Sequence, residues 1–233
     1  VLSRVVHGDA NESGVDAEVG GGGGHGGVAS GARGPQSPYD LVDVWAAGED
    51  GAVRHWDGLA WQTVAAPEDD YEAILADADS VYAAGAIRLR KLDRVSGTWT
   101  LEGAPAVQGV RGLLRSADGR ILALGTGRLF VSEDGGWTAI ATPPDVTVRA
   151  GIVRQNGELV IVGDRGTLLV GTSPETLVAV PVATTYDLTA LTEEPDGTLV
   201  VVGDNGVALR GTSAQNLRLE TIPDYRSKAY GVV

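Results

Sequence analysis

Few residues of this chain have the types and spacing that chemistry requires. The three histidines are His7, His25 and His55, and no two of them have the spacing of a metal-binding pair. No Gly-x-Ser-x-Gly motif marks a nucleophilic serine, and the glycine run 20–24 lacks the Lys-Ser or Lys-Thr of a phosphate loop. We therefore expect a protein that is not an enzyme and that has no cofactor.

Three carboxylates follow glycines in related turns, which raises the question of calcium. Asp164 and Asp204 lie in Gly-Asp-x-Gly sequences, and Asp50 lies in Gly-Glu-Asp-Gly. Calcium takes about 6–8 oxygen ligands, and each turn supplies only one or two carboxylates. We interpret these sequences as hairpin turns and predict no metal site.

Basic residues are concentrated between residues 88 and 128. This segment holds eight basic and three acidic residues, whereas the whole chain has a formal net charge of −13. Arg88 and Arg90 are two residues apart on an expected strand, so their side chains share one face. The segment is predicted to bind an acidic protein surface, such as that of a second copy; scattered surface charge is the equal alternative. The predicted partner-binding residues are Arg88, Arg90, Lys91, Arg94, Arg111, Arg115, Arg120 and Arg128.

The composition excludes several classes of function. There is no cysteine, which excludes disulfides, thiol catalysis and cysteine-ligated metals. The excess of acidic residues argues against non-specific nucleic-acid binding. No apolar run approaches the ~18 residues of a membrane-spanning helix, so no membrane span is expected. With 233 residues and a hydrophobic fraction of 43%, the chain can form one large all-β domain.

An apolar run followed by a glycine turn recurs along the chain. The structural unit that this repeat forms must position the charged residues described above. The run 159–162 precedes Gly163, and the run 199–202 precedes Gly203, 40 residues later. Looser copies precede Gly48, Gly85 and Gly125, at spacings of 37, 40 and 38 residues. Four short strands in each copy of about 40 residues make one blade of a β-propeller.

The copies predict an all-β, five-bladed β-propeller of four-stranded antiparallel blades. Residues 1–36 form a Gly-rich N-terminal arm outside the ring, and residues 37–233 form the propeller. Residues 229–233 resemble a first strand, and the first copy lacks one. We therefore expect the C-terminal strand to complete the first blade and to close the ring. The expected blades are 38–67 with 227–233, 68–105, 106–145, 146–187 and 188–226.

The segment 132–137, Ser-Glu-Asp-Gly-Gly-Trp, carries a further signature. It resembles a shortened Asp-box, Ser-x-Asp-x-Gly-x-x-Trp, and weaker forms precede Trp61 and Trp99. Leu177 and Leu217 occupy the tryptophan position of the last two copies. Over residues 38–233 the chain is similar to Asp-box (bacterial neuraminidase-repeat) and photosystem II assembly-factor-like propellers. In that class the box is a structural turn, which implies that Trp61, Trp99 and Trp137 belong to the core.

The predicted function is that of a non-enzymatic structural or binding propeller. A sialidase-like activity would need an arginine cluster and a Tyr–Glu pair, and no such motif is recognisable. Ordering the arm, which holds 11 glycines, requires compensating contacts. We predict a protein-interaction module on an extracellular, cell-surface or virion-like assembly, which meets a protein partner or further copies through the arm and the basic segment. The alternatives are a glycan-binding propeller of lectin or sialidase-like type and an assembly chaperone of a membrane complex.

Overall fold

The computed structural model describes residues 2–4, 43–102, 109–134, 136–142 and 146–221. Within these ranges, 20 strands form five four-stranded antiparallel sheets, here called the first to fifth sheets. The first sheet consists of β1 (Leu2–Arg4), β2 (Val44–Ala47), β3 (Val53–Trp56) and β4 (Trp61–Val64). The second consists of β5 (Tyr71–Ala76), β6 (Ser80–Gly85), β7 (Leu89–Asp93) and β8 (Thr98–Leu101).

The other three sheets repeat this order along the chain. The third consists of β9 (Gly112–Arg115), β10 (Ile121–Leu124), β11 (Arg128–Glu133) and β12 (Gly136–Ala141). The fourth consists of β13 (Val148–Val153), β14 (Leu159–Gly163), β15 (Thr167–Gly171) and β16 (Val178–Ala179). The fifth consists of β17 (Leu188–Glu193), β18 (Leu199–Gly203), β19 (Val207–Gly211) and β20 (Arg218–Thr221). Each sheet is one blade, and the chain is a five-bladed β-propeller, as the repeat predicts.

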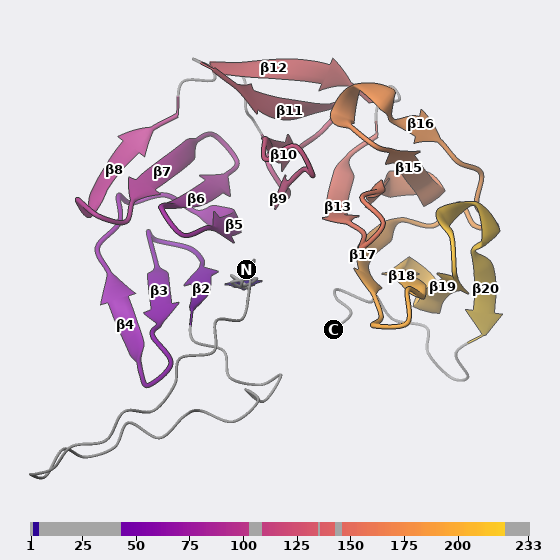
Figure 1. The fold of residues 1–233 in the computed structure, drawn as a ribbon, viewed down its shortest axis with the longest axis horizontal. Coiled ribbons are helices and arrows are strands. Elements are labelled where there is room, and N and C mark those ends of the chain that lie inside the picture. The colour runs from indigo at the N-terminus through magenta and orange to yellow at the C-terminus, as the bar shows by residue number, and fades with distance from the viewer. Residues whose placement is uncertain (1, 5–42, 103–108, 135, 143–145, 222–233) are drawn as a thin grey trace, which may run out of the picture.

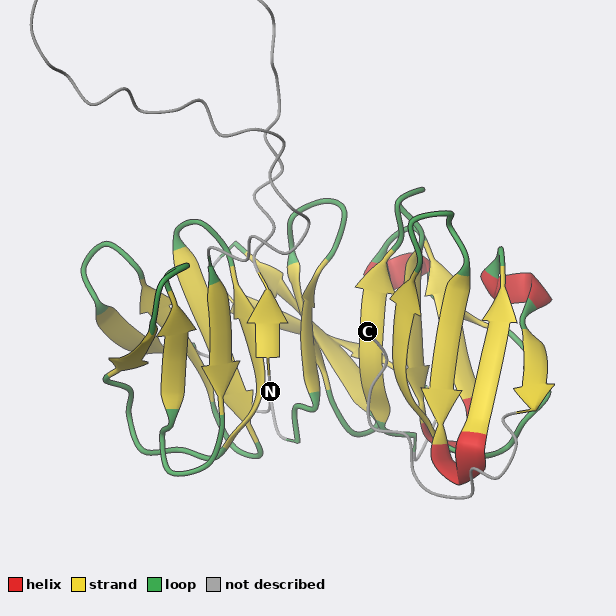
Figure 2. Cartoon of the chain, turned by 90° about the horizontal axis from the view of Figure 1, so that it is seen from below, coloured by secondary structure: helices red, strands yellow, loops and turns green. Residues whose placement is uncertain are grey.

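The blades follow one another around an arc (Figure 1). Neighbouring blades meet through their first strands, with β1 beside β5, β5 beside β9, β9 beside β13 and β13 beside β17. The first and fifth sheets stand at the two ends of the arc (Figure 1). The strands lie roughly along one common axis and alternate in direction (Figure 2). Among the described residues there are therefore four interfaces between sheets.

The first sheet differs from the prediction in its innermost strand. Leu2, Ser3 and Arg4 pair antiparallel with Ala46, Trp45 and Val44, so β1 occupies the place where residues 229–233 were expected. Residues 229–233 themselves lie outside the described ranges. The repeat pattern does not reveal β1, because a long Gly-rich insertion separates its three residues from β2. The chain order of this blade is therefore the same as in the other four, and Leu2–Arg4 belongs to the ring and not to the predicted arm.

The core consists of one apolar cluster between each pair of neighbouring sheets in the described part of the chain. The middle strands are buried on both faces, as in β10 and β14, whose residues are almost fully inaccessible. This explains why the second strand of each repeat is a continuous apolar run and not an alternating pattern. The fourth strands are largely exposed, for example β4 and β16.

The Gly-x-x-Gly turns have two backbone constraints that explain the motif. Asp50, Arg165 and Asn205 have φ of 54°, 55° and 57°, and the glycine after each also has a positive φ, as a tight hairpin turn requires. The glycine that opens the motif is required for a different reason. A Cβ on Gly163 would lie 2.3 Å from the Thr147 carbonyl oxygen, and a Cβ on Gly203 would lie 2.1 Å from that of Asp187. Thr147 and Asp187 directly precede the first strand of the same blade. The interpretation of these sequences as hairpin turns is thus confirmed.

Helix is almost absent from the described ranges. The helical elements are four 3-10 turns of three residues: η1 (Asp164–Gly166), η2 (Pro174–Thr176), η3 (Asp204–Gly206) and η4 (Ala214–Asn216). None of the helices within the described residues is long and apolar enough to cross a membrane.

Candidate functional site

One cross-strand pair occupies the same place in each blade, between the second and third strands. In the third sheet Leu122 lies opposite Val131, and in the fourth Val160 lies opposite Val170. All four side chains are buried, and each pair packs against the next sheet. At these two interfaces, apolar side chains close the space between the blades.

The second sheet carries a polar pair at this place. Tyr82 lies opposite Lys91, both are half-buried, and the Lys91 ammonium lies 5.6 Å from the centroid of the Tyr82 ring. Because this pair does not fill the space up to the third sheet, the interface opens into a groove of about 680 Å³. The groove is lined by Tyr82, Lys91, Glu102, Asp118, Gly119, Arg120, Ser132, Glu133, Asp134, Gly136 and Trp137.

The tryptophans of the fourth strands have three different environments. The indole N–H of Trp99 donates to the Ala65 carbonyl at 2.8 Å, and its ring stacks on Tyr71, so Trp99 closes the first interface. Trp137 packs against the cluster between the second and third sheets, but its indole N–H has no acceptor among the described residues. Trp61 is 49% exposed, which corrects the prediction that it belongs to the core; within the described ranges, Trp99 and Trp137 pack against a preceding sheet and Trp61 does not. Of the three tryptophans, Trp137 is the one that lines the groove.

Charges in the groove are only partly compensated within the chain. Arg120 bonds Asp118 at 2.8 Å and Glu175, in η2 of the fourth sheet, at 2.6 Å. The hydrogen bond from Arg120 is the main cause that lowers the pKa of Glu175 to about 2. The neighbouring Tyr82 hydroxyl raises the pKa of Lys91, so this side chain stays cationic over the whole neutral range. Arg120 is therefore committed to the link between the third and fourth sheets.

The first interface contains a buried polar network that the sequence did not predict. Asp43 is 6% exposed. Its Oδ1 accepts a hydrogen bond from Trp45 Nε1 at 2.8 Å and lies 2.7 Å from His55 Nε2, and its Oδ2 accepts a hydrogen bond from Arg94 Nη1 at 2.8 Å. Burial raises the pKa of Asp43, but the hydrogen bonds from Arg94, Trp45 and His55 outweigh it and hold the pKa below its usual value. His55 is therefore a packed residue, and its ring stacks on Trp45 with the two centroids 4.3 Å apart.

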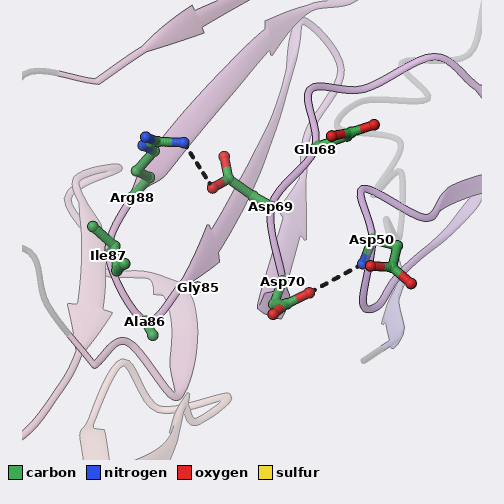
Figure 3. Close-up of a pocket in the computed structure, with 8 residues that line it drawn as sticks. All are labelled: Asp50, Glu68, Asp69, Asp70, Gly85, Ala86, Ile87 and Arg88. Atoms are coloured by element: carbon green, nitrogen blue, oxygen red, sulfur yellow. Dashed lines mark hydrogen bonds and ion pairs between the residues drawn. The ribbon is translucent and has the colours of Figure 1, made fainter.

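A second hollow lies between the first and second sheets, at the end that carries the Gly-x-x-Gly turns (Figure 3). Its volume is about 490 Å³, and it is lined by Asp50, Glu68, Asp69, Asp70, Gly85, Ala86, Ile87 and Arg88. Arg88 pairs with Asp69 at 3.1 Å, and Asp70 accepts a hydrogen bond from the Asp50 backbone (Figure 3). No group of three or more histidines and carboxylates in the described part of the chain is arranged to hold a metal ion.

The eight predicted partner-binding residues do not form one free basic surface. Most of them are paired with carboxylates, several across an interface between sheets. Arg88 and Arg90 pair with Asp69, Arg94 with Asp43, Arg111 with Glu72, Arg115 with Asp77, and Arg120 with Asp118 and Glu175. Lys91 lies over Tyr82 in the groove, and Arg128 is exposed without an ion pair to any described residue. The sequence could locate these arginines but not their acidic partners, which lie up to 55 residues away along the chain.

Comparisons with known proteins show the fold alone. No family model matches the chain, and no curated protein matches it by sequence. Among solved structures, the extracellular domain of the one-component system BT4673 from B. thetaiotaomicron is similar at a TM-score of 0.68 and 14% identity. That match covers 84% of this chain but 29% of the other, so this chain spans less than a third of that domain.

Two further structures are similar over a larger share of their length. YCF48 bound to D1 peptide matches at a TM-score of 0.59 and 17% identity, over 76% of this chain and 64% of YCF48. Virginiamycin B lyase from Staphylococcus aureus matches at 0.67 and 15%, over 78% of this chain and 67% of the lyase. These neighbours agree with the propeller fold that the photosystem-factor resemblance implies.

Proposed function

We propose that this chain is a non-enzymatic, protein-binding β-propeller that holds a partner segment in the groove between its second and third sheets. The observation that carries the proposal is the replacement of a buried apolar pair by Tyr82 and Lys91. At the two following interfaces the same position is sealed by Leu122–Val131 and Val160–Val170. A groove of about 680 Å³ lies in the range of small ligand sites, and aromatic side chains are the usual anchors of protein recognition.

Two observations support binding over catalysis. Asp43, the carboxylate paired with His55, is buried and also held by Trp45 and Arg94, so this pair is occupied in joining blades. The groove is lined by two aromatic rings, several carboxylates and the cations Lys91 and Arg120, which suits recognition of a peptide segment. The neighbour YCF48 was solved with a D1 peptide, which supports a peptide as the class of ligand.

The proposal extends to the site of action. The likeness to an extracellular domain supports a place outside the cell, on a surface or in an extracellular assembly. We propose, as the sequence suggested, that the Gly-rich insertion joins the chain to that assembly; it lies outside the described residues. Replacing residues 5–42 with a short linker, so that β1 is kept, should leave the melting temperature unchanged and abolish assembly in size-exclusion chromatography. Retained assembly would refute this part.

The binding function is tested with a random peptide library displayed on phage. The purified chain is used for selection, and the Trp137→Ala variant is the counter-selection. Selected peptides should bind Trp137→Ala about tenfold more weakly, which corresponds to about 1.4 kcal/mol for one aromatic anchor. Trp61→Ala is the matched control, because Trp61 occupies the same position in the first sheet and faces away from the groove.

Tyr82→Phe provides a second, less disruptive variant, whose melting curve should match that of the parent chain. Peptides that bind equally well to Trp137→Ala, or a selection that yields none, would overturn the proposal. Selection of oligosaccharides in place of peptides on an array, with the same dependence on Trp137, would favour the alternative of a glycan-binding propeller.

A further inference from the structure

The first and second interfaces carry different residues at the same three positions. In the first interface, the ring of Trp45 contacts His55 at 4.3 Å and the guanidinium of Arg94 at 5.4 Å. Arg94 comes from the second sheet and also pairs with Asp43, so a cation of the chain itself fills the space between the blades.

The register of the strands shows what occupies each of these places one blade later. Tyr82 corresponds to Trp45, and Lys91 corresponds to His55, because each pair lies at the same position of its sheet. Counting along the third strands from Lys91 and from its counterpart Val131, the residue at the place of Arg94 is Asp134. The second interface therefore has a carboxylate where the first has its internal arginine.

The carboxylates that face this groove are not all compensated. Asp118 is bound to Arg120, and Glu133 accepts a hydrogen bond from the Thr138 hydroxyl at 2.7 Å. Within the described residues, Asp134 has no hydrogen bond or ion pair, whereas Glu102 has an electrostatic interaction with Lys91 but no direct ion pair. Tyr82 and Trp137 place two aromatic rings beside them. A ring next to an unpaired carboxylate is the arrangement that attracts a cation.

We propose that the groove takes a cationic side chain, an arginine or a lysine of a partner protein, in the place that Arg94 fills at the first interface. The proposal rests on the function proposed above and names the chemistry of its partner. The cation lies against the Trp137 ring, because Lys91 already lies over Tyr82, and it pairs with Asp134 and Glu102. The negative net charge of the chain adds to the attraction, since a field of this sign concentrates cationic partners. An acidic segment would meet these two carboxylates and be repelled.

The test follows the indole N–H signal of Trp137 in ¹H–¹⁵N spectra of the full chain, assigned with Trp137→Phe. The probes are the peptide acetyl-Gly-Arg-Gly-amide and its citrulline analogue, which is nearly isosteric with arginine and neutral. The arginine peptide should shift the Trp137 signal, and the citrulline peptide should bind about tenfold more weakly. The double variant Glu102→Gln/Asp134→Asn should lower the affinity for the arginine peptide by a similar factor, while Glu220→Gln, an exposed carboxylate of the fifth sheet, should not change it.

A gain-of-charge variant sharpens the test. Asp134→Arg restores an internal cation at the place of Arg94, so it should abolish binding of the arginine peptide and leave the chain folded. Equal binding of the two peptides, or no shift at about 10 mM arginine peptide, would overturn the proposal. Library-selected peptides that depend on Trp137 but carry no basic residue would overturn this inference and leave the proposed binding function standing.

Discussion

The four interfaces between sheets fall into two groups that differ in how the same positions are used. Between the third, fourth and fifth sheets, pairs such as Leu122–Val131 are fully buried in continuous apolar clusters. Between the first three sheets, the corresponding pairs are Trp45–His55 and Tyr82–Lys91, and charged side chains surround them. The fold tolerates both solutions, because the backbone pairing within each blade is the same.

With the binding function that we propose, the difference separates positions used for stability from positions used for recognition. An apolar pair at this position contributes burial alone, whereas an aromatic–polar pair keeps donors, acceptors and charge within reach of a ligand. At the first interface the charged groups pair with each other, since Arg94 forms an ion pair with Asp43. The second has left them open to the groove, and it is the only one of the two in which we place a partner.

The largest effect should come from Leu122→Ala. Its side chain is 0% exposed, so the substitution removes core volume between the third and fourth sheets. We expect a loss of about 2–5 kcal/mol in the free energy of unfolding, measured by urea denaturation. Tyr82→Ala, at the same position of the half-open interface, should cost only about 1 kcal/mol, since its ring is already partly solvated. Equal losses for the two variants would contradict the division into two kinds of interface.

The second largest effect on stability should come from removing Asp43, the carboxylate that accepts hydrogen bonds at the first interface. Asp43→Ala leaves Arg94 without its carboxylate and should lower the free energy of unfolding by about 2–3 kcal/mol. The folded-state pKa of Asp43 lies below its unfolded value near 3.8. Its contribution is therefore complete above about pH 4 and is lost as the pH falls through the lower folded value. Urea midpoints from pH 2 to 7 should converge for the parent and Asp43→Ala at the acid end, and parallel curves would refute the account.

A third substitution converts the second interface to the apolar kind. Tyr82→Leu combined with Lys91→Val reproduces the Leu122–Val131 pair of the third sheet. We expect the free energy of unfolding to rise by about 1 kcal/mol as apolar contacts replace the polar pair. Peptides selected on the parent chain should no longer bind. Calorimetry and the phage-derived peptides measure the two effects, and a variant that still binds them would show that the groove does not depend on this pair.

The smallest effect concerns the ion pair between Arg120 and Glu175, which joins the third and fourth sheets. Arg120 of the third sheet holds the pKa of Glu175 at about 2, against an unperturbed value of 4.5. The contribution of this exposed pair to stability is present above about pH 4.5 and is lost as the pH falls toward 2. In Arg120→Gln, the pKa of Glu175 should rise toward its ordinary value, since the hydrogen bond from Arg120 is the largest of the causes that lower it. An unchanged midpoint in the NMR titration would show that the pair does not exist in solution.

Much of the fold could be predicted because its signals are local. The period of the apolar runs gave the five blades, and the Gly-x-x-Gly turns have the positive φ values that their residues imply at Asp50, Arg165 and Asn205. Leu177 and Leu217 lie in the interfaces, as their correspondence to the tryptophan position suggested. Each of these features depends on residues close together in the chain.

The parts of the fold that could not be predicted depend on distant segments. The strand Leu2–Arg4 is too short to carry a pattern, and pairing with β2 is what defines it. Trp61 has the same local sequence context as its counterparts, but whether a blade covers it is a property of the ring. The site shows the same limit, since eight basic residues could be located while their partners, such as Asp43 for Arg94, could not.

The sequence by itself therefore determined the architecture: an all-β repeat protein, its turns and its blades. It determined these because strand and turn propensities act over a few residues and the repeat multiplies their signal. The tertiary structure alone decided which strand completes the first blade, which charged side chains pair and which interface holds a groove. These depend on side chains about 40 residues apart that meet only when neighbouring blades pack, and their Coulomb energy is fixed by distance and burial.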